Sequence, residues 1–454
     1  MYVAASLLMV GACFTSCSDD DEASYSGSAV TNTQLKTILT QKGCQFNEQG
    51  NLLLDGVAQG ITSLDLSGTK MTDFSELTIL PNLTEVDLSD NNYEMSFDFS
   101  KLPEQITAVD LTGNEIYEFP GLVNIVTAEN GEETVTVLHK LTKFSLPESA
   151  KYNCDEIPAY FAKNTEADMK MANASGSLEA YNTLREVPDE GFRTILKSTF
   201  PSMFNGDKID ISKRLVSTSE VTQGISTYNP DAQTETVDNV EGFQYIVDNK
   251  GFQGSSLHLQ TNETCTISYF PVSSNINDIL LLHISTPNGI DLSHARNFSY
   301  LDMEYNPTIE TLDFTGSTAF GQRGDKAEYV GQSTPSSLVA LSCESLTDIT
   351  FPALAKVAQT IELVNCPKMQ KVDLSQFETM YRLRFGLMPT SCEITYLSPK
   401  RLLNDANMLF GIDDAMYNRT DTKAFLDTYH KQLQYTGLSR GHGTKACNWT
   451  RYYQ

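Results

Sequence analysis

The chain has few of the residues that mark several common classes of protein. Its 454 residues include one tryptophan, and its nine cysteines are scattered singly without a C-x-x-C pair, which argues against a zinc site and a disulfide framework. Beyond the N-terminus, no apolar run approaches the ~20 residues of a membrane-spanning helix. No G-x-S-x-G, P-loop, H-E-x-x-H or dinucleotide fingerprint occurs. The sequence therefore offers no motif for an enzyme, and we expect no cofactor.

Basic residues are also scarce. Aspartate and glutamate number 58 against 32 lysines and arginines, which gives a formal net charge of −26. Such an acidic surface repels phosphate backbones and anionic membranes, so nucleic acid is not an expected partner. The acidity favours solubility and identifies no specific ligand.

The N-terminus has the features of an export signal. Val3–Phe14 is apolar and rich in small residues, is too short to span a bilayer, and leads to Cys17. Such a segment is typical of a signal peptide, which we predict over residues 1–16. Cys17 is the predicted lipidation site, and Cys13, in the sequence Val-Gly-Ala-Cys, is the alternative. An acidic tether is expected over residues 17–30, with the membrane contacted through the lipid anchor only.

Internal repeats dominate the first half of the chain. The sequence ITSLDLSGT from Ile61 recurs as LTEVDLSDN from Leu83 and as ITAVDLTGN from Ile106, and LTKFSL follows from Leu141. The steps are 22, 23 and 35 residues, which places an insertion of about a dozen residues near 124–135. This is the leucine-rich-repeat pattern LxxLxLxxN. It predicts short strands with the LxL pair pointing inward, and an asparagine ladder that bonds backbone groups from turn to turn.

The outward slots of these strands form the predicted binding face. Asp65, Asp87 and Asp110 share one slot in three successive repeats, where like charges would stand about 4.8 Å apart. Either a bound cation relieves this repulsion or the slot is a solvated acidic strip, and Ser145 in the fourth repeat favours the strip. We therefore predict no metal site. The predicted concave binding face consists of Ser63, Asp65, Glu85, Asp87, Asp110 and Lys143.

The second half of the chain repeats differently. Short strands recur about every 11 residues from Thr360 onward, so each turn of about 22 residues holds two of them. This predicts a flattened solenoid with strands on both faces, interrupted by a polar loop near 316–336. The predicted strands are Tyr300–Met303, Thr311–Phe314, Val339–Cys343, Thr347–Phe351, Thr360–Leu363, Lys371–Leu374, Arg382–Phe385 and Glu393–Tyr396.

A similar unit precedes each repeat region. Leu35–Leu39 and Phe192–Leu196 predict short amphipathic helices, and a strand follows each, near 46–54 and 204–212. A solenoid needs such caps, because its terminal repeat otherwise exposes an apolar end. Near the C-terminus, a helix is predicted over Thr420–Gln434 with Thr420 as its N-cap.

The predicted fold class is thus an α+β solenoid, with leucine-rich-repeat-like parallel strands, helical caps and two tandem arrays. After the signal peptide and tether, we expect a cap plus first array over 31–180. A second cap plus second array, with two strands per turn, is expected over 181–400. Residues 401–454 are expected to form a C-terminal cap or tail.

These features resemble a family of leucine-rich-repeat surface lipoproteins of Bacteroidota. Cys17 followed by Ser-Asp-Asp-Asp-Glu is similar to their export tag, and Pro-Asp-x-x-Phe ending at Phe192, followed by Asn-Gly-Asp ending at Asp207, is similar to their caps. The resemblance implies an outer-membrane lipoprotein facing the cell exterior. That family's function is not established, so the resemblance adds no binding residue beyond the lipidated cysteine.

The most concrete functional prediction is a non-catalytic module that binds an unknown protein or glycan. Solenoids offer extended surfaces without catalysis. The alternatives are a structural or accessory subunit of an outer-membrane complex, or a polymer-degrading hydrolase. Tyr93, Tyr117 and Phe119 follow strands and are either exposed contact residues or, more commonly, packing residues of the convex side.

Overall fold

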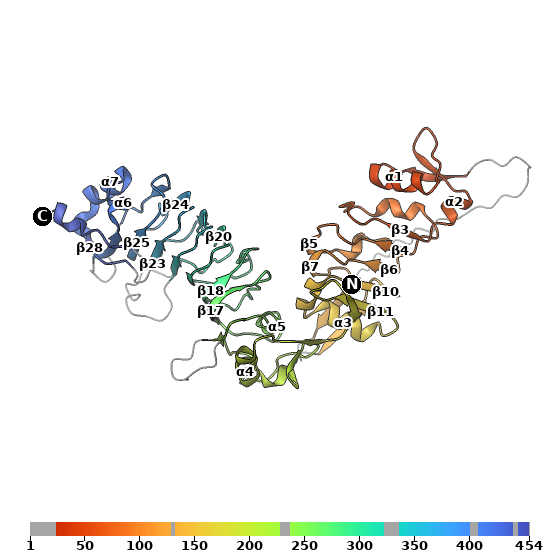
Figure 1. Cartoon of the computed structure of the whole chain (residues 1–454), viewed down its shortest axis with the longest axis horizontal. Coiled ribbons are helices and arrows are strands. Elements are labelled where there is room, and N and C mark those ends of the chain that lie inside the picture. Colours follow the sequence, from red (N-terminus) through yellow and green to blue (C-terminus); the bar gives the residue numbers. More distant parts are fainter. Residues whose placement is uncertain are drawn as a thin grey trace, which may run out of the picture. The chain divides into compact units, whose positions relative to one another are not determined.

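The computed structural model describes residues 24–128, 132–227, 237–321, 336–399, 407–438 and 444–453. The predicted signal peptide, Cys13 and Cys17 lie outside the described residues. The chain divides into two compact units (Figure 1). The first comprises the residues up to Asn124, Thr136–Glu148 and Asn164–Ala180, and the second comprises Ile125–Val135, Ser149–Lys163 and the residues from Tyr181 onward.

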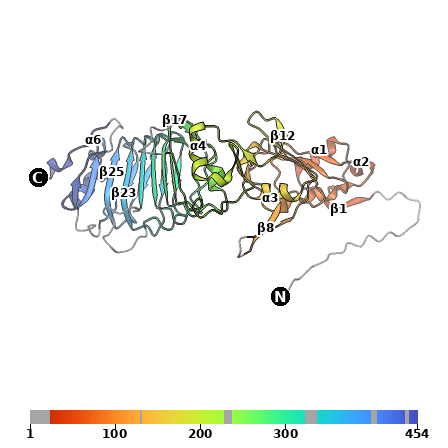
Figure 2. The ribbon, with the colours of Figure 1, turned by 90° about the horizontal axis from the view of Figure 1, so that it is seen from below.

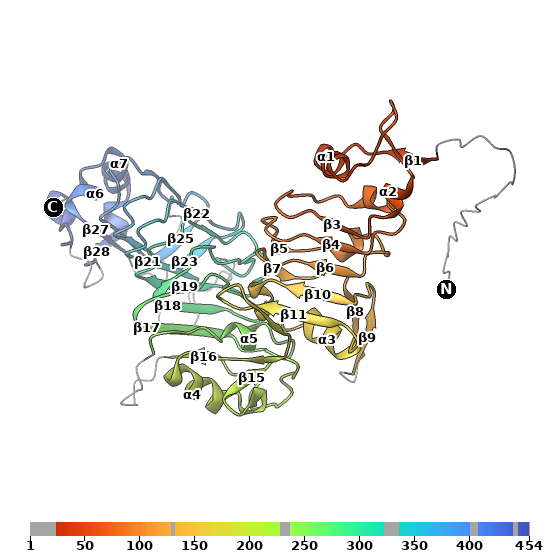
Figure 3. The same cartoon turned by 45° about the vertical axis from the view of Figure 1, so that its right-hand side comes forward.

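The first unit is built around a six-stranded sheet in the order β12-β11-β10-β6-β4-β3 (Figure 3). The strands β3, β4, β6, β10 and β11 are parallel, and β12 is antiparallel. Paired in register, Leu64, Val86, Val109 and Phe144 are all buried, which confirms the repeats predicted from the LxL pattern. The strands are β3 Ser63–Asp65, β4 Glu85–Asp87, β6 Ala108–Asp110, β10 Lys143–Leu146, β11 Asp168–Ala172 and β12 Leu178–Ala180.

Buried asparagines join successive turns of this unit. The Asn91 side chain accepts a hydrogen bond from the Lys70 backbone N–H at 2.6 Å and donates to the Leu66 carbonyl at 3.1 Å. The Asn114 side chain accepts from the Asn91 backbone N–H at 2.9 Å and donates to the Leu88 carbonyl at 3.0 Å. The predicted asparagine ladder is confirmed, and it satisfies backbone groups that leave the sheet at each turn.

Smaller elements surround the first sheet. The strand β1 corrects the predicted tether, because its residues pair antiparallel with β2 although they fall within 17–30. The predicted insertion forms the separate two-stranded sheet β8-β9. These elements are β1 Tyr25–Ala29, α1 Thr33–Gln41, β2 Asn51–Leu53, α2 Gly56–Gln59, η1 Ser75–Ile79, β5 Glu94–Ser96, η2 Phe99–Lys101, β7 Glu115–Glu118, β8 Val123–Thr127 and β9 Glu133–Val137.

The second unit has a nine-stranded and a four-stranded sheet (Figures 1 and 2). All eight predicted strands are present: four alternate members belong to each sheet, as expected for two strands per turn. The large sheet contains β16 Ile225–Ser226, β17 Ser256–Thr266, β18 Asp278–Ser285, β19 Tyr300–Glu304, β21 Ser337–Leu341, β23 Val357–Val364, β25 Thr379–Gly386, β27 Met408–Ile412 and β28 Leu433–Tyr435. The small sheet contains β20 Thr311–Asp313, β22 Asp348–Thr350, β24 Lys371–Asp373 and β26 Glu393–Thr395.

Apolar side chains fill the space inside these turns. Phe314 packs against Phe298, Phe320 and Phe351 with ring centroids 5.0–6.1 Å apart, and all four rings are buried. Burial of these rings stabilises the turns that contribute them, because the short strands bury little surface alone.

The remaining elements of the second unit include the predicted helices. The helix predicted at Phe192–Leu196 is present within α4, which Asp189 caps by accepting from the Phe192 backbone N–H at 2.8 Å. The helix predicted over Thr420–Gln434 was too long and its N-cap was wrong, because Arg419 is the N-cap and β28 follows. The other elements are η3 Glu148–Tyr152, α3 Glu156–Lys163, β13 Leu184–Arg185, α4 Glu190–Thr199, η4 Pro201–Met203, β14 Phe204–Asn205, β15 Lys208–Asp210, α5 Gln244–Val247, α6 Asp414–Tyr417, α7 Thr420–Tyr429, η5 His430–Gln432 and η6 Trp449–Tyr452.

Two further observations bear on function. The seven cysteines in the described part of the chain are free thiols, and all but Cys154 are buried. Among the described residues, no helix combines the length and apolar content needed to cross a bilayer.

Candidate functional site

The six predicted binding-face residues lie on one face of the first sheet. Register places Ser63, Glu85 and Lys143 in one row, and Asp65, Asp87 and Asp110 in the next. The Lys143 ammonium lies 3.6 Å from the Glu85 carboxylate, with both side chains at least half exposed. Such an exposed ion pair contributes little stability. The structure therefore brings the predicted residues together, and their role in binding stays a prediction.

The repeated aspartates have a local structural role. The Asp65 carboxylate accepts from the Ser67 backbone N–H at 3.0 Å, and Asp110 accepts from the Thr112 backbone N–H at 2.9 Å. The hydrogen bonds from Ser67 lower the pKa of Asp65. Asp followed two residues later by Ser or Thr is thus a turn signal in the first three repeats. Within the described residues, no three or more His, Cys, Asp or Glu side chains are grouped to hold a metal ion.

The three aromatic residues considered from the sequence pack against the fold. Phe119 and Tyr117 are buried, and half-buried Tyr93 donates its hydroxyl proton to the Met71 carbonyl. The interpretation as packing residues is confirmed, so these rings are not an exposed binding patch.

A cavity on the large sheet of the second unit has more of the features of a binding site. The parallel register of β17, β18 and β19 aligns His258 with Leu280 and Asp302, and Gln260 with Leu282 and Glu304. These side chains alternate with buried ones along each strand, so they share the outward face. They enclose a cavity of about 170 Å³ lined by His258, Gln260, Leu280, Leu281, Leu282, Asp302 and Glu304.

Asp302 is the electrostatically unusual member of this cavity. Its Oδ1 atom is buried without a hydrogen-bond partner, and its Oδ2 accepts from the Tyr300 hydroxyl at 3.4 Å. Burial, followed by the charge of Glu304, raises the pKa of Asp302 to about 6. Beside it, the His258 imidazole contacts the Asp278 carboxylate. An ionised carboxylate with one oxygen kept from water and without a hydrogen bond favours a cation nearby.

The sequence contained signals for this site that the repeat pattern did not use. The segment from Ser256, Ser-Leu-His-Leu-Gln, alternates in polarity, and the segment from Asp278, Asp-Ile-Leu-Leu-Leu, contains an apolar run. Both patterns are typical of strands. Neither matches LxxLxLxxN, so β17 and β18 were not predicted. His258 was consequently not placed beside the predicted strand that carries Asp302.

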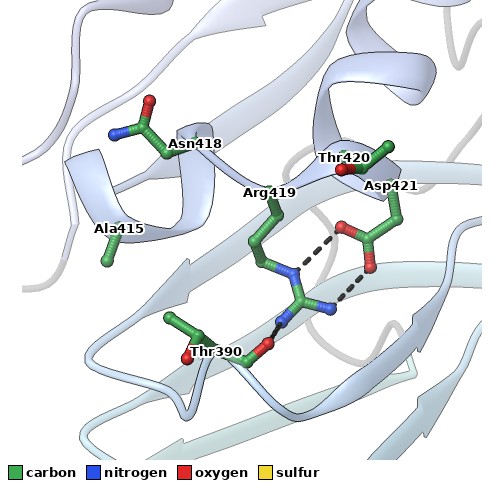
Figure 4. A pocket seen from close by; sticks show the side chains of 6 residues that line it. All are labelled: Thr390, Ala415, Asn418, Arg419, Thr420 and Asp421. Atoms are coloured by element: carbon green, nitrogen blue, oxygen red, sulfur yellow. Dashed lines mark hydrogen bonds and ion pairs between the residues drawn. The ribbon is translucent and has the colours of Figure 1, made fainter.

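A second, more open depression lies beside α6 and α7 (Figure 4). The Arg419 guanidinium donates to both carboxylate oxygens of Asp421, at 2.9 and 2.6 Å, and to the Thr390 carbonyl at 2.7 Å. Burial is the largest single influence and acts to raise the pKa of Asp421, but the hydrogen bonds from Arg419 and Thr422 and the charge of Arg419 together lower that pKa. The arginine is committed to holding the start of α7 against the loop before β26, so this depression is a weaker candidate site.

The parallel strands, buried leucine positions and asparagine ladder define a leucine-rich-repeat type of fold. Two solved leucine-rich-repeat structures are similar to the chain. A leucine-rich-repeat protein of Leptospira interrogans has 11% identity and a TM-score of 0.23, covering 84% of this chain and 96% of its own. The leucine-rich-repeat domain of APL1 has 12% identity and a TM-score of 0.21, covering 80% of this chain and 78% of its own. No family model and no curated protein matches the sequence.

Proposed function

We propose that this protein is a non-catalytic binding module that presents the face of β17, β18 and β19 to a protein or glycan. The observation that carries the proposal is the cavity between Leu280, Leu282 and Asp302, where apolar surface and a partly buried carboxylate adjoin on an outward strand face. Apolar walls with a few placed polar groups are typical of ligand sites.

The size of the cavity supports binding over catalysis. Its volume of about 170 Å³ is below the roughly 300 Å³ at which small-molecule sites begin, so it suits one side chain or sugar unit of a larger ligand. The buried thiols are poor nucleophiles, because burial raises the pKa of Cys366 to about 12 and that of Cys343 well above its usual value.

We also propose that the strands of the two units form tandem repeat arrays with helical caps. In the chain, α1 precedes the strands of the first array and α4 precedes those of the second, and a hairpin-like pairing follows each helix. In the second copy, Gly206 has a φ of +64° between β14 and β15, a backbone conformation that glycine adopts without strain. The cap would cover the apolar end of its array.

The proposed location is the outer membrane, with the protein facing the cell exterior on a lipid at Cys17. Palmitate labelling of Cys17→Ala beside Cys13→Ala tests the anchor. We expect Cys17→Ala to lose the label and Cys13→Ala to keep it. The reverse result would identify Cys13 as the lipidated residue, and full labelling of the double variant would contradict the anchor.

A matched pair of variants tests the binding face. Leu280→Arg places a bulky charge in the cavity, whereas Leu354→Arg makes the same change at a site that is already 67% exposed in the same unit. Both proteins, with the wild type, are applied to a glycan array and chemically crosslinked in native outer membranes. We expect Leu280→Arg alone to lose the ligand.

The other outcomes distinguish the alternatives. Equal retention of the ligand by both variants would place binding elsewhere and contradict the proposed face. A partner that stays bound in fixed stoichiometry to both variants would favour a structural subunit. Release of sugar or peptide products during the array experiment would favour a hydrolase.

A further inference from the structure

The cavity on β17, β18 and β19 has the dimensions of a single side chain. A cavity of 150 Å³ is known to hold one benzene molecule, and this one measures about 170 Å³. It lies on an outward strand face, so a side chain that projects from a partner's backbone can enter it. The occupant is therefore expected to be one residue of a larger ligand.

The walls of the cavity are apolar along one strand and acidic along the next. Leu280 and Leu282 on β18 are half-buried and face outward, where strand residues of a solvated face are usually polar. Asp302 and Glu304 stand directly opposite them on β19. An occupant that matches both walls has an aliphatic stem and a positively charged end.

Carboxylates outnumber cations around Asp302. Glu304 on the same strand and Glu362 on β23 both act to raise its pKa, and Asp278 on β18 acts on neighbouring Tyr300. Besides Asp302 and Tyr300, the acidic and basic side chains on β17, β18, β19, β23 and β25 are His258, Glu263, Asp278, His283, Glu304, Glu362, Arg382 and Arg384. Among these side chains, Arg384 pairs with Glu362 at 3.0 Å, and the His258 imidazole contacts the Asp278 carboxylate.

We propose that this cavity receives a cationic side chain of a protein partner, with the stem against Leu280 and Leu282 and the charge at Asp302 and Glu304. The inference rests on the proposed function, since it names the ligand of the proposed face. It commits to a protein partner, because the net charge of −26 favours a basic protein surface over acidic or neutral polymers.

Protonation of Asp302 competes with this ligand. The pKa of the Asp302 carboxyl is raised to about 6, mainly by burial, so the group is largely ionised at pH 7 and largely protonated at pH 5. A cation binds the ionised form. Its affinity should therefore fall by about tenfold between pH 7 and pH 5.

The test uses the full-length chain with methyl-labelled leucines and capped tripeptides Ala-X-Ala, where X is lysine, arginine, norleucine or glutamate. Titration of each peptide at pH 7.5 is followed by the Leu280 and Leu282 methyl signals, which report on this cavity directly. We expect the lysine or arginine peptide to shift both signals with a dissociation constant on the order of millimolar, as one side chain can supply. Norleucine, which has the stem without the charge, should bind at least tenfold more weakly.

Two isosteric variants make the test specific. Asp302→Asn removes the charge inside the cavity, and Glu310→Gln removes one charge from an exposed position of the same unit. We expect Asp302→Asn to weaken binding of the cationic peptide by about tenfold or more. Glu310→Gln should leave the affinity for that peptide unchanged. A preference for lysine over arginine, or the reverse, would identify which cation the partner supplies.

Other results would overturn the inference. Equal affinity for norleucine and lysine, or equal losses in both variants, would show that the cavity does not recognise positive charge. Such a failure is distinct from failure of the proposed function. If the natural ligand is a glycan or a neutral protein and Leu280→Arg abolishes its binding, the proposed binding face stands. Only the inference of a cationic side chain is then refuted.

Discussion

Replacement of Asp302 by asparagine should stabilise the second unit in a pH-dependent way. Burial raises the pKa of this carboxyl from 3.8 to about 6. Each unit of pKa corresponds to about 1.36 kcal/mol, so the folded, ionised protein carries a cost of up to about 3 kcal/mol at pH 8. Asparagine has nearly the same shape, can still accept from the Tyr300 hydroxyl, and carries no charge to desolvate.

The sign of the effect follows from linkage. A carboxyl whose folded pKa exceeds its unfolded value destabilises the fold above pH 6, and the cost disappears as pH falls below 3.8. Thermal unfolding at pH 8 should therefore show Asp302→Asn melting higher than the wild type, by roughly 2–4 °C for each kcal/mol gained. At pH 3.5 the two proteins should melt together.

Glu310→Gln is the control, because Glu310 is exposed and outside the cavity. Its melting temperature should follow the wild type at both pH values. Equal stabilisation by Asp302→Asn at pH 8 and pH 3.5 would indicate a packing effect instead of charge burial. Destabilisation at pH 8 would mean that the ionised carboxylate has a favourable partner, which contradicts the reasoning.

Three further variants test how the fold is held together. Asn114→Ala should lower the free energy of unfolding in denaturant by at least about 3 kcal/mol, because it leaves several buried backbone groups without a hydrogen bond. The control Asn124→Ala, at an exposed site, should leave that free energy unchanged. Asp110→Ala should lower the free energy of unfolding by about 1 kcal/mol, and Asp110→Asn should lower it less, since asparagine keeps the acceptor for the turn. Denaturant unfolding of the two variants measures this difference. Arg419→Lys should cost about 1–2 kcal/mol and increase hydrogen exchange in α7, because lysine cannot reproduce the two parallel bonds to Asp421; unchanged exchange would count against that role.

The repeat fold was predictable because its physics is local. An LxL pair and an aspartate that bonds two residues ahead act within one turn of chain, and the asparagine that bonds the previous turn follows them at a fixed spacing. Val86 and Asn91 therefore identify a repeat without knowledge of the neighbouring turns. The eight strands of the second half were found for the same reason, since most of them alternate in polarity over a few residues.

The candidate site was less predictable because it depends on pairing between turns. Asp302 and Leu280 are separated by one full turn of the solenoid and meet only through the register of β18 and β19. Their own strands carry no signature of a site. Likewise, the segment near Tyr25 has an acidic neighbourhood that suggested a tether, yet it pairs as β1 with residues beyond α1. Propensity within a segment cannot reveal such a partner.

The central claim is that the face of β17, β18 and β19 contacts the natural ligand. The most direct measurement places a photoreactive amino acid at position 282, inside the cavity, or at position 354, outside it, and illuminates cells that display each protein. A discrete crosslinked adduct from position 282 and none from position 354 is the predicted result. No adduct from position 282, or the same adduct from both positions, would contradict the claim.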